Sequence, residues 1–236
     1  MHQGRSDNYD LQSYKFKKVT PPVEEAGVKY YQKGNFHVIE ANPLDIEIKL
    51  AYGKTMSQLE EKFAINGTFF DTPNPALSKS VWQIAINNGI TLGENAFTNN
   101  YSGVRKGTMV CFEDGRVIMD RFNNVSEISK LGKIKWAIGG NAAYPDYNLK
   151  IERAASDISR VAPHTLLAYT KDKKVLLLIT KMNKHLDNVV ADLRSIFNLY
   201  SAINLDGGGS TSMKADGAVI KDQGRKLNNI IAVKQA

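Results

Sequence analysis

Cysteine, long apolar runs and clustered charge are scarce in this 236-residue chain, and each scarcity excludes a class of protein. A single cysteine, Cys111, can form neither an internal disulfide nor a cysteine-rich metal cluster. We interpret it as a thiol packed in a strand. The longest apolar run, Val175 to Ile179, is too short to cross a bilayer, so no membrane span is predicted. Residues 1–8 contain no apolar core and therefore do not resemble a signal peptide.

The positive charge of the chain is scattered rather than concentrated. The formal net charge is +7, yet no block of five like charges occurs and no expected helix carries a basic stripe. The sequence therefore contains no specific signal for nucleic acid, and we interpret the excess lysines as a solvated surface. Weak attraction to a polyanion, such as nucleic acid, teichoic acid or a phosphorylated sugar, is the alternative interpretation.

The domain organisation follows from composition and periodicity. Residues 1–27 are polar and contain two consecutive prolines, which predicts an arm or linker before a single domain at 28–236. A short helix is expected at 55–63, where Thr55 suits the capping position. A long helix is expected at about 185–200, because apolar residues recur there at i, i+3, i+4 and i+7.

Strand signals dominate the rest of the chain. Asn88-Gly89 closes one apolar run. Turn-forming residues at Asp114-Gly115 and at 171–173 each separate two short apolar runs, and these two spacings predict hairpins. No internal repeat and no low-complexity tract is present. The expected fold class is α+β, with a mixed, mostly antiparallel sheet core on which one long and one short helix pack.

Three apolar segments end in a polar residue beside glycine. The three endings are Asn66-Gly67, Gly139-Gly140-Asn141 and Asp206-Gly207-Gly208-Gly209. Strand ends along one rim of a sheet are where rigid scaffolds usually present binding groups. Each ending alone is most often a turn, but the three together favour a shared site.

The run from Asp206 to Thr211 carries the most specific chemistry. Its glycines allow backbone N–H groups to form a concave array that receives an anion, and Ser210 and Thr211 add hydroxyl donors. Asp206 follows a buried strand and suits a general acid or base, a sugar-hydroxyl acceptor or a metal ligand. A glycine-rich bend without any ligand is the alternative.

Several other chemistries lack sequence support. No Gly-Lys-Ser/Thr follows the glycines, so the run is not a Walker-type phosphate loop, and no helix pattern opens after Gly209, so it is not a dinucleotide fingerprint. No serine-hydrolase elbow and no zinc-binding histidine spacing is present. His164 lies just before a predicted strand. It suits a hydrogen-bond donor to a phosphate or an acid–base group, and the alternative is a solvent-facing histidine.

These motifs, in this order, resemble the phosphodiester glycosidase family. The resemblance rests on Asn66-Gly67-Thr68-Phe69-Phe70, on Ile138-Gly139-Gly140 and above all on the stretch from Asn204 to Met213. The closing segment from Arg225 to Val233 is also similar to the end of that family. The resemblance covers about three-quarters of the chain, from Ala64 onward.

The resemblance implies hydrolysis of a sugar-1-phosphodiester through an oxocarbenium-like transition state. Asp206 is then the candidate carboxylate and Asp71 a second one. It further implies a catalytic set and a set that binds the substrate and its phosphate. The candidate catalytic residues are Asp206, Asn66, His164 and Asp71, and the candidate binding residues are Gly140, Arg160, Gly207, Gly208, Gly209, Ser210, Thr211 and Arg225.

Two positions depart from the family pattern. The family usually has Pro-Arg-Thr where this chain has Pro163-His164-Thr165, so an arginine that grips phosphate is replaced by a histidine that is charged only part of the time near neutral pH. Either Arg160 supplies the missing charge, or the phosphate grip and the pH optimum differ. The second departure is Thr68, where the family often has glycine.

Two further readings of function stay open at this point. One is a non-catalytic module that binds a phosphosugar or cell-wall polymer, which the His164 departure favours. The other is a hydrolase acting on a nucleotide or nucleotide sugar. The sequence requires no cofactor, leaves a divalent metal open, and does not predict an oligomeric state. The missing signal peptide, lone cysteine and basic charge fit a bacterial or phage protein, either cytoplasmic or part of a larger phage or cell-surface-directed chain.

Overall fold

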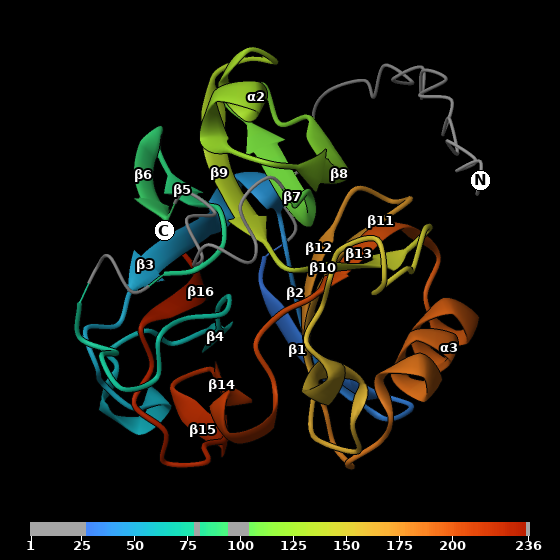
Figure 1. The fold of residues 1–236 in the computed structure, drawn as a ribbon. Coiled ribbons are helices and arrows are strands. Elements are labelled where there is room, and N and C mark those ends of the chain that lie inside the picture. Colours follow the sequence, from blue (N-terminus) through green and yellow to red (C-terminus); the bar gives the residue numbers. More distant parts are fainter. Residues whose placement is uncertain (1–26, 78–80, 94–103, 235–236) are drawn as a thin grey trace, which may run out of the picture.

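The structure is a computed structural model that describes residues 27–77, 81–93 and 104–234. In these residues the chain forms three β-sheets and two α-helices, and every strand pairing is antiparallel. Figure 1 shows one sheet at the right, one at the lower left and one at the top. None of the helices in the described segments has the length and apolar character that a membrane crossing requires.

The first sheet has six strands, and helix α3 (Leu186–Ile196) lies on its outer face (Figure 1). In spatial order the strands are β1 (Lys29–Lys33), β2 (Phe36–Ala41), β12 (Val175–Thr180), β11 (Thr165–Thr170), β13 (Leu199–Asn204) and β10 (Asn141–Tyr144).

The other two sheets have five strands each. The second sheet runs in the order β15 (Ala218–Lys221), β14 (Met213–Ala215), β4 (Ala64–Asn66), β16 (Asn229–Val233) and β3 (Ile46–Leu50). The third runs in the order β6 (Ile90–Gly93), β5 (Ala85–Asn87), β9 (Ile134–Gly139), β7 (Lys106–Phe112) and β8 (Val117–Phe122), and carries the short helix α2 (Val125–Ser129).

One central core joins all three sheets. It contains buried side chains from each of them, among them Ile39, Ile65, Met109, Trp136, Leu177 and Ile203. Alternate residues of β12 face opposite ways, because successive strand side chains point to opposite faces. Leu177 packs in the central core, whereas Leu176 and Leu178 pack against α3. Burial on both faces explains why β12 is the most apolar run of the chain.

The sheet-rich part of the predicted fold is confirmed, and so are the hairpins. The β7–β8 pair turns at Asp114-Gly115, and the β11–β12 pair turns at 171–174, where Lys173 has φ +64°. Asn88 and Gly89 both have positive φ between β5 and β6, as a two-residue hairpin turn with Asn-Gly requires. The predicted arm lies, apart from Gly27, outside the described residues.

The predicted helices are too long. At 55–63 only a single 3-10 turn forms, Met56–Gln58, and the Gln58 side chain accepts from the Thr55 N–H at 3.0 Å. The long helix ends at Ile196 instead of Tyr200, because Leu199 already pairs with Thr170 of β11. Phe197 keeps the apolar spacing, yet it is extended and packs on Phe36. Because the apolar spacing continues from α3 into β13, the sequence pattern does not reveal where the helix ends.

Candidate active site

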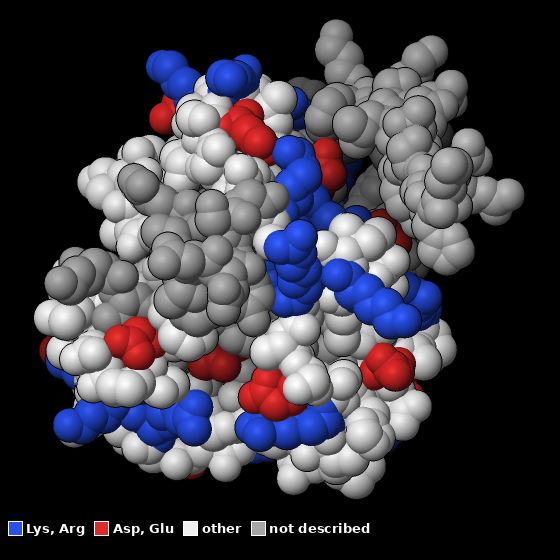
Figure 2. Space-filling view, in the orientation of Figure 1, with Lys and Arg blue, Asp and Glu red and all other residues white. Residues whose placement is uncertain are grey.

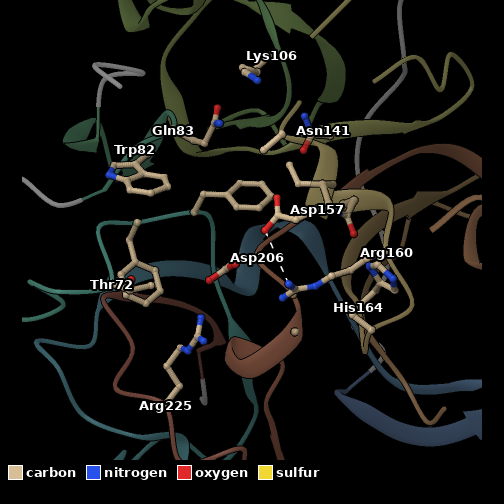
Figure 3. Close-up of a pocket in the computed structure, with 18 residues that line it drawn as sticks. Thr72, Trp82, Gln83, Lys106, Asn141, Asp157, Arg160, His164, Asp206 and Arg225 are labelled. Atoms are coloured by element: carbon tan, nitrogen blue, oxygen red, sulfur yellow. Dashed lines mark ion pairs between the residues drawn. The ribbon is translucent and has the colours of Figure 1, made fainter. Parts of the chain in front are cut away.

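A pocket of about 360 Å³ lies where strand ends of the three sheets meet. Asp206, Gly207 and Gly208 follow β13, His164 precedes β11, and Arg225 lies between β15 and β16. The pocket is lined by Phe69, Phe70, Thr72, Trp82, Gln83, Lys106, Asn141, Ala155, Asp157, Ile158, Arg160, Ala162, His164, Asn204, Asp206, Gly207, Gly208 and Arg225. Figure 3 shows the Asp206 carboxylate near its centre.

The backbone of Asp206 is fixed from the neighbouring sheet. Its N–H donates to the Gly67 carbonyl at 3.3 Å, and its carbonyl accepts from Asn66 Nδ2 at 2.7 Å. Burial raises the pKa of Asp206 to about 6, against the opposing effects of a hydrogen bond with Ser210 and of the Arg225 charge. The carboxyl group therefore titrates close to neutral pH, a property that acid–base groups at active sites often have.

Asn66 positions the pocket without lining it. The side chain is 1% exposed, and Oδ1 accepts from Thr165 Oγ1 at 2.7 Å and from the Ser212 N–H at 3.0 Å. Nδ2 is occupied by the Asp206 carbonyl. The amide thus ties β4, β11 and the Asp206 loop together. In the structure Asn66 therefore contacts the Thr165 hydroxyl and two backbone groups, and the catalytic role suggested by the sequence stays a prediction.

The triple glycine lets two arginines approach the Asp206 loop. A Cβ at Gly208 would lie 3.1 Å from Arg160 Nη2, and one at Gly209 would lie 2.7 Å from Arg225 Nη2. Gly208 also has φ +57°, a conformation that favours glycine. Its N–H donates to the Pro163 carbonyl at 2.8 Å. The Gly208 N–H is therefore already used inside the protein. The group available to an anion at this position is the Arg160 guanidinium.

Arg160 and Arg225 place positive charge at the pocket. Both residues are exposed. Arg225 Nη1 donates weakly to Ser210 Oγ at 3.4 Å, and Arg160 faces Asp157 at 4.0 Å, an exposed pair marked in Figure 3. Exposed ion pairs contribute little, so neither guanidinium is committed to a strong internal partner. Two such groups suit bidentate binding of a phosphate.

His164 is a buried, largely uncharged group. The residue is 2% exposed, and burial lowers the pKa of its imidazole, which hydrogen bonds only partly offset. Nε2 lies 2.9 Å from the Lys184 carbonyl, which can only accept, so Nε2 carries the hydrogen and Nδ1 is left as an acceptor in the neutral ring. On this side of the pocket the positive charge comes from the guanidinium groups of Arg160 and Arg225 rather than from His164.

Other candidates from the sequence lie outside the pocket lining. Asp71 accepts from Asn74 Nδ2 at 2.9 Å in a turn. Gly140 donates its N–H to the Gly107 carbonyl, and a Cβ there would overlap the Asn204 carbonyl oxygen. Thr211 Oγ1 donates to the Pro163 carbonyl at 3.1 Å. Asp71 is thus a turn residue, and Gly140 permits a close backbone approach between strands.

The pocket also contains residues to which the sequence analysis assigned no role. Among them are the two polar side chains Gln83 and Lys106, the aromatic Trp82, and the asparagines Asn141 and Asn204. Asn141 and Asn204 did lie in quoted motifs, as polar residues at strand ends. Gln83 and Lys106 carried no such signal. Across the described part of the chain, no group of three or more His, Cys, Asp or Glu side chains is arranged to hold a metal ion.

Charge on the visible face of the molecule is mixed. Figure 2 shows lysine and arginine side chains interspersed with acidic ones, and not one continuous basic surface. This arrangement agrees with the scattered charge of the sequence.

Comparison with known proteins identifies one family and several solved structures with a similar fold. A family model described as phosphodiester glycosidase matches residues 60–234. No curated protein matches the sequence. The fold is similar to the catalytic domain of zebrafish N-acetylglucosamine-1-phosphodiester alpha-N-acetylglucosaminidase, solved in a form auto-inhibited by its pro-peptide, with a TM-score of 0.66 and 17% identity over 93% of this chain and 86% of that one. A hypothetical protein from Synechocystis has a TM-score of 0.58 and 14% identity over 87% of this chain and 61% of that one.

Proposed function

Because the chain belongs to the phosphodiester glycosidase family, we propose that it is a hydrolase that cleaves the glycosidic bond of a sugar-1-phosphodiester. The bond that breaks joins the anomeric carbon to a phosphate oxygen. Water adds to the sugar, and the phosphate leaves with its other substituent still attached. An N-acetylglucosamine-1-phosphodiester is the model substrate, since a protein of similar fold is named for acting on it.

One observation carries the proposal: a titratable carboxylate and two guanidinium groups share a single pocket. Cleavage at an anomeric carbon develops positive charge on the sugar, which an ionised carboxylate stabilises. Asp206 supplies this carboxylate, and above pH 6 it is mainly ionised. Arg160 and Arg225 stabilise the negative charge on the departing phosphate. A phosphate monoester leaves readily, so the reaction needs no strongly acidic side chain.

The replacement of the family arginine at His164 fits this assignment. The Arg160 guanidinium reaches over Gly208, directly beside the loop that carries Asp206. His164 Nδ1 lies beside the same loop, 3.7 Å from the position that a Cβ of Gly207 would occupy. Phosphate binding therefore depends on Arg160 and Arg225, and does not require a charged histidine.

The test is product analysis with Asp206→Asn as the matched variant. Wild-type protein is incubated with an aryl-phospho-N-acetylglucosamine diester, with UDP-N-acetylglucosamine and with a teichoic-acid fragment, and free sugar is measured. We expect free sugar from the diester, and a loss of about 10²–10⁴-fold in rate in the variant.

Three results would contradict the proposal. Free sugar released equally by Asp206→Asn would remove Asp206 from the chemistry. Measurable binding of the diester by a folded wild-type protein, with no product from any substrate, would instead support a non-catalytic binding module. Activity on the nucleotide sugar alone would move the assignment to a nucleotide-sugar hydrolase.

A further inference from the structure

The pocket carries an unusual concentration of unsatisfied acceptors. Among the described residues, four buried side-chain polar atoms lack a hydrogen-bond partner, and three of the four are amide oxygens of pocket residues. They are Gln83 Oε1, Asn141 Oδ1 and Asn204 Oδ1. The Asn204 side chain also lies close enough to His164 to raise the pKa of that imidazole, so Gln83 and Asn141 are the stronger pair. The three residues are 7%, 1% and 2% exposed. Buried polar groups are normally paired, so a cluster of unpaired ones in one cavity indicates a ligand that supplies the donors.

The orientation of the Asn141 amide is imposed by its surroundings. Asn141 Nδ2 donates to Glu152 Oε2 at 2.9 Å, and a carboxylate can only accept, so the amide nitrogen must face Glu152 and the oxygen must face away. Asn141 is also the register partner of Asn204 in the β10–β13 pair. The two asparagines therefore present their side chains from adjacent positions on neighbouring strands.

Glu152 is held rigidly enough to impose that orientation. Its side chain is fully buried, and the carboxylate accepts from Arg121 Nε at 2.7 Å and from the Ala142 N–H at 3.1 and 3.2 Å. Its backbone carbonyl accepts from Lys106 Nζ. One buried residue thus anchors both Asn141 and Lys106, the two pocket residues that begin β10 and β7.

The pocket has two chemically different ends. We call Gln83, Asn141 and Asn204 the amide end, and Arg160 and Arg225 the arginine end. In Figure 3, Gln83, Asn141 and Lys106 lie toward the top, Arg225 toward the bottom and Arg160 at the right, with Asp206 between them. Uncharged amide oxygens match the hydroxyl donors of a sugar, whereas guanidinium groups match a phosphate.

We propose that the Asn141 carboxamide, oriented by the buried Glu152 carboxylate, is a sugar-recognition group of this pocket. Its oxygen accepts a hydrogen bond from a sugar hydroxyl, with Gln83 and Asn204 beside it, so the sugar lies at the amide end and the phosphate at the arginine end. This inference rests on the proposed function, since that function supplies a substrate with both parts. Glu152 is a positioning residue and does not touch the sugar.

The experiment measures the two parts of the substrate separately. Asp206→Asn protein, which is expected not to turn over, is titrated with an intact sugar phosphodiester and with the phosphate monoester that lacks the sugar. Adding Asn141→Ala should weaken binding of the diester about tenfold and leave binding of the monoester unchanged, since one hydrogen bond to the sugar is lost. Arg160→Ala should weaken binding of both ligands.

Glu152→Gln tests the positioning role. It should weaken binding of the diester as Asn141→Ala does, and it should cause no further loss once Asn141 is already alanine, because the two residues act as one unit. A merely structural role would weaken both ligands and would add to the Asn141→Ala effect. If Glu152→Gln does not fold, judged by circular dichroism, the Asn141→Ala result alone decides the proposal.

The outcomes separate this inference from the proposed function. Unchanged binding of the diester in Asn141→Ala, or equal loss of both ligands, overturns the inference even if the wild type is an active hydrolase. Selective loss of the diester supports the inference even if the wild type releases no sugar and the proposed hydrolysis fails. If the folded protein binds no sugar phosphodiester, both proposals are wrong.

Discussion

At the scale of single residues, the proposed reaction depends on the ionisation of Asp206. Burial raises its pKa to about 6, so the carboxylate fraction changes most between about pH 5 and 7. If the ionised form stabilises the transition state, kcat/KM should rise with pH through this range and level off above it. A pH–rate profile on the aryl diester measures this rise. A profile that falls across the same range would assign Asp206 as a general acid instead.

The same shift predicts a cost in stability. A carboxyl group whose pKa is raised in the folded state stabilises the fold while protonated, and this contribution is lost as pH rises through the folded-state pKa. Asp206→Asn should therefore be more stable than wild type at pH 8, by about 1–2 kcal/mol, and should match it near pH 4. Chemical unfolding at the two pH values measures the difference. A difference that does not vary with pH would refute this account.

At the scale of elements, the glycines of the loop after β13 lack side chains, and this allows arginine side chains to approach the loop backbone. Gly209 has no positive φ, but a Cβ at this position would lie only 2.7 Å from Arg225 Nη2, so glycine leaves room for the guanidinium. Gly209→Ala should therefore displace Arg225 and raise KM for the diester several-fold, with a change in unfolding free energy below about 1 kcal/mol.

Gly217 offers the matched control for this substitution. It lies in the β14–β15 turn at φ +78°, and a Cβ there would meet no atom within 4 Å. Gly217→Ala should lower stability by about 1 kcal/mol through backbone strain, and leave KM unchanged. Steady-state kinetics and unfolding of both variants distinguish the two glycines. An unchanged KM in Gly209→Ala would mean that Arg225 is not positioned by this loop.

Some element boundaries can be predicted from the local sequence pattern, and others cannot. Hairpin turns depend on residues adjacent in sequence, such as Asp114-Gly115 between β7 and β8, and these positions were predictable. The end of α3 was not, because Phe197 and Tyr200 continue the apolar spacing of the helix. What stops the helix is the pairing of Leu199 with Thr170, a contact with a distant strand.

At the scale of the whole molecule, the central core holds the three sheets that form the pocket. Cys111 lies in this core, fully buried on β7, and burial raises the pKa of its thiol to about 12. The thiol should therefore not react with a disulfide reagent in the folded protein, and should react fully after unfolding. Labelling with Ellman's reagent, with and without denaturant, measures this. Rapid labelling of the native protein would indicate that the core opens locally.

The sequence by itself determined the local features: the hairpin turns, the dominance of strands, and the strand-end motif that contains Asp206. Each of these depends on residues a few positions apart, whose backbone preferences act in any fold. Only the tertiary structure decided which strand ends meet. It brought Asp206, His164, Arg160 and Arg225 to one pocket and left Asn66 and Asp71 outside the lining. It also brought Gln83, Lys106 and Asn141 to that pocket. The order of strands in a sheet is set by long-range pairing and shared core packing, and the spacing along one chain does not encode which distant strand becomes a neighbour.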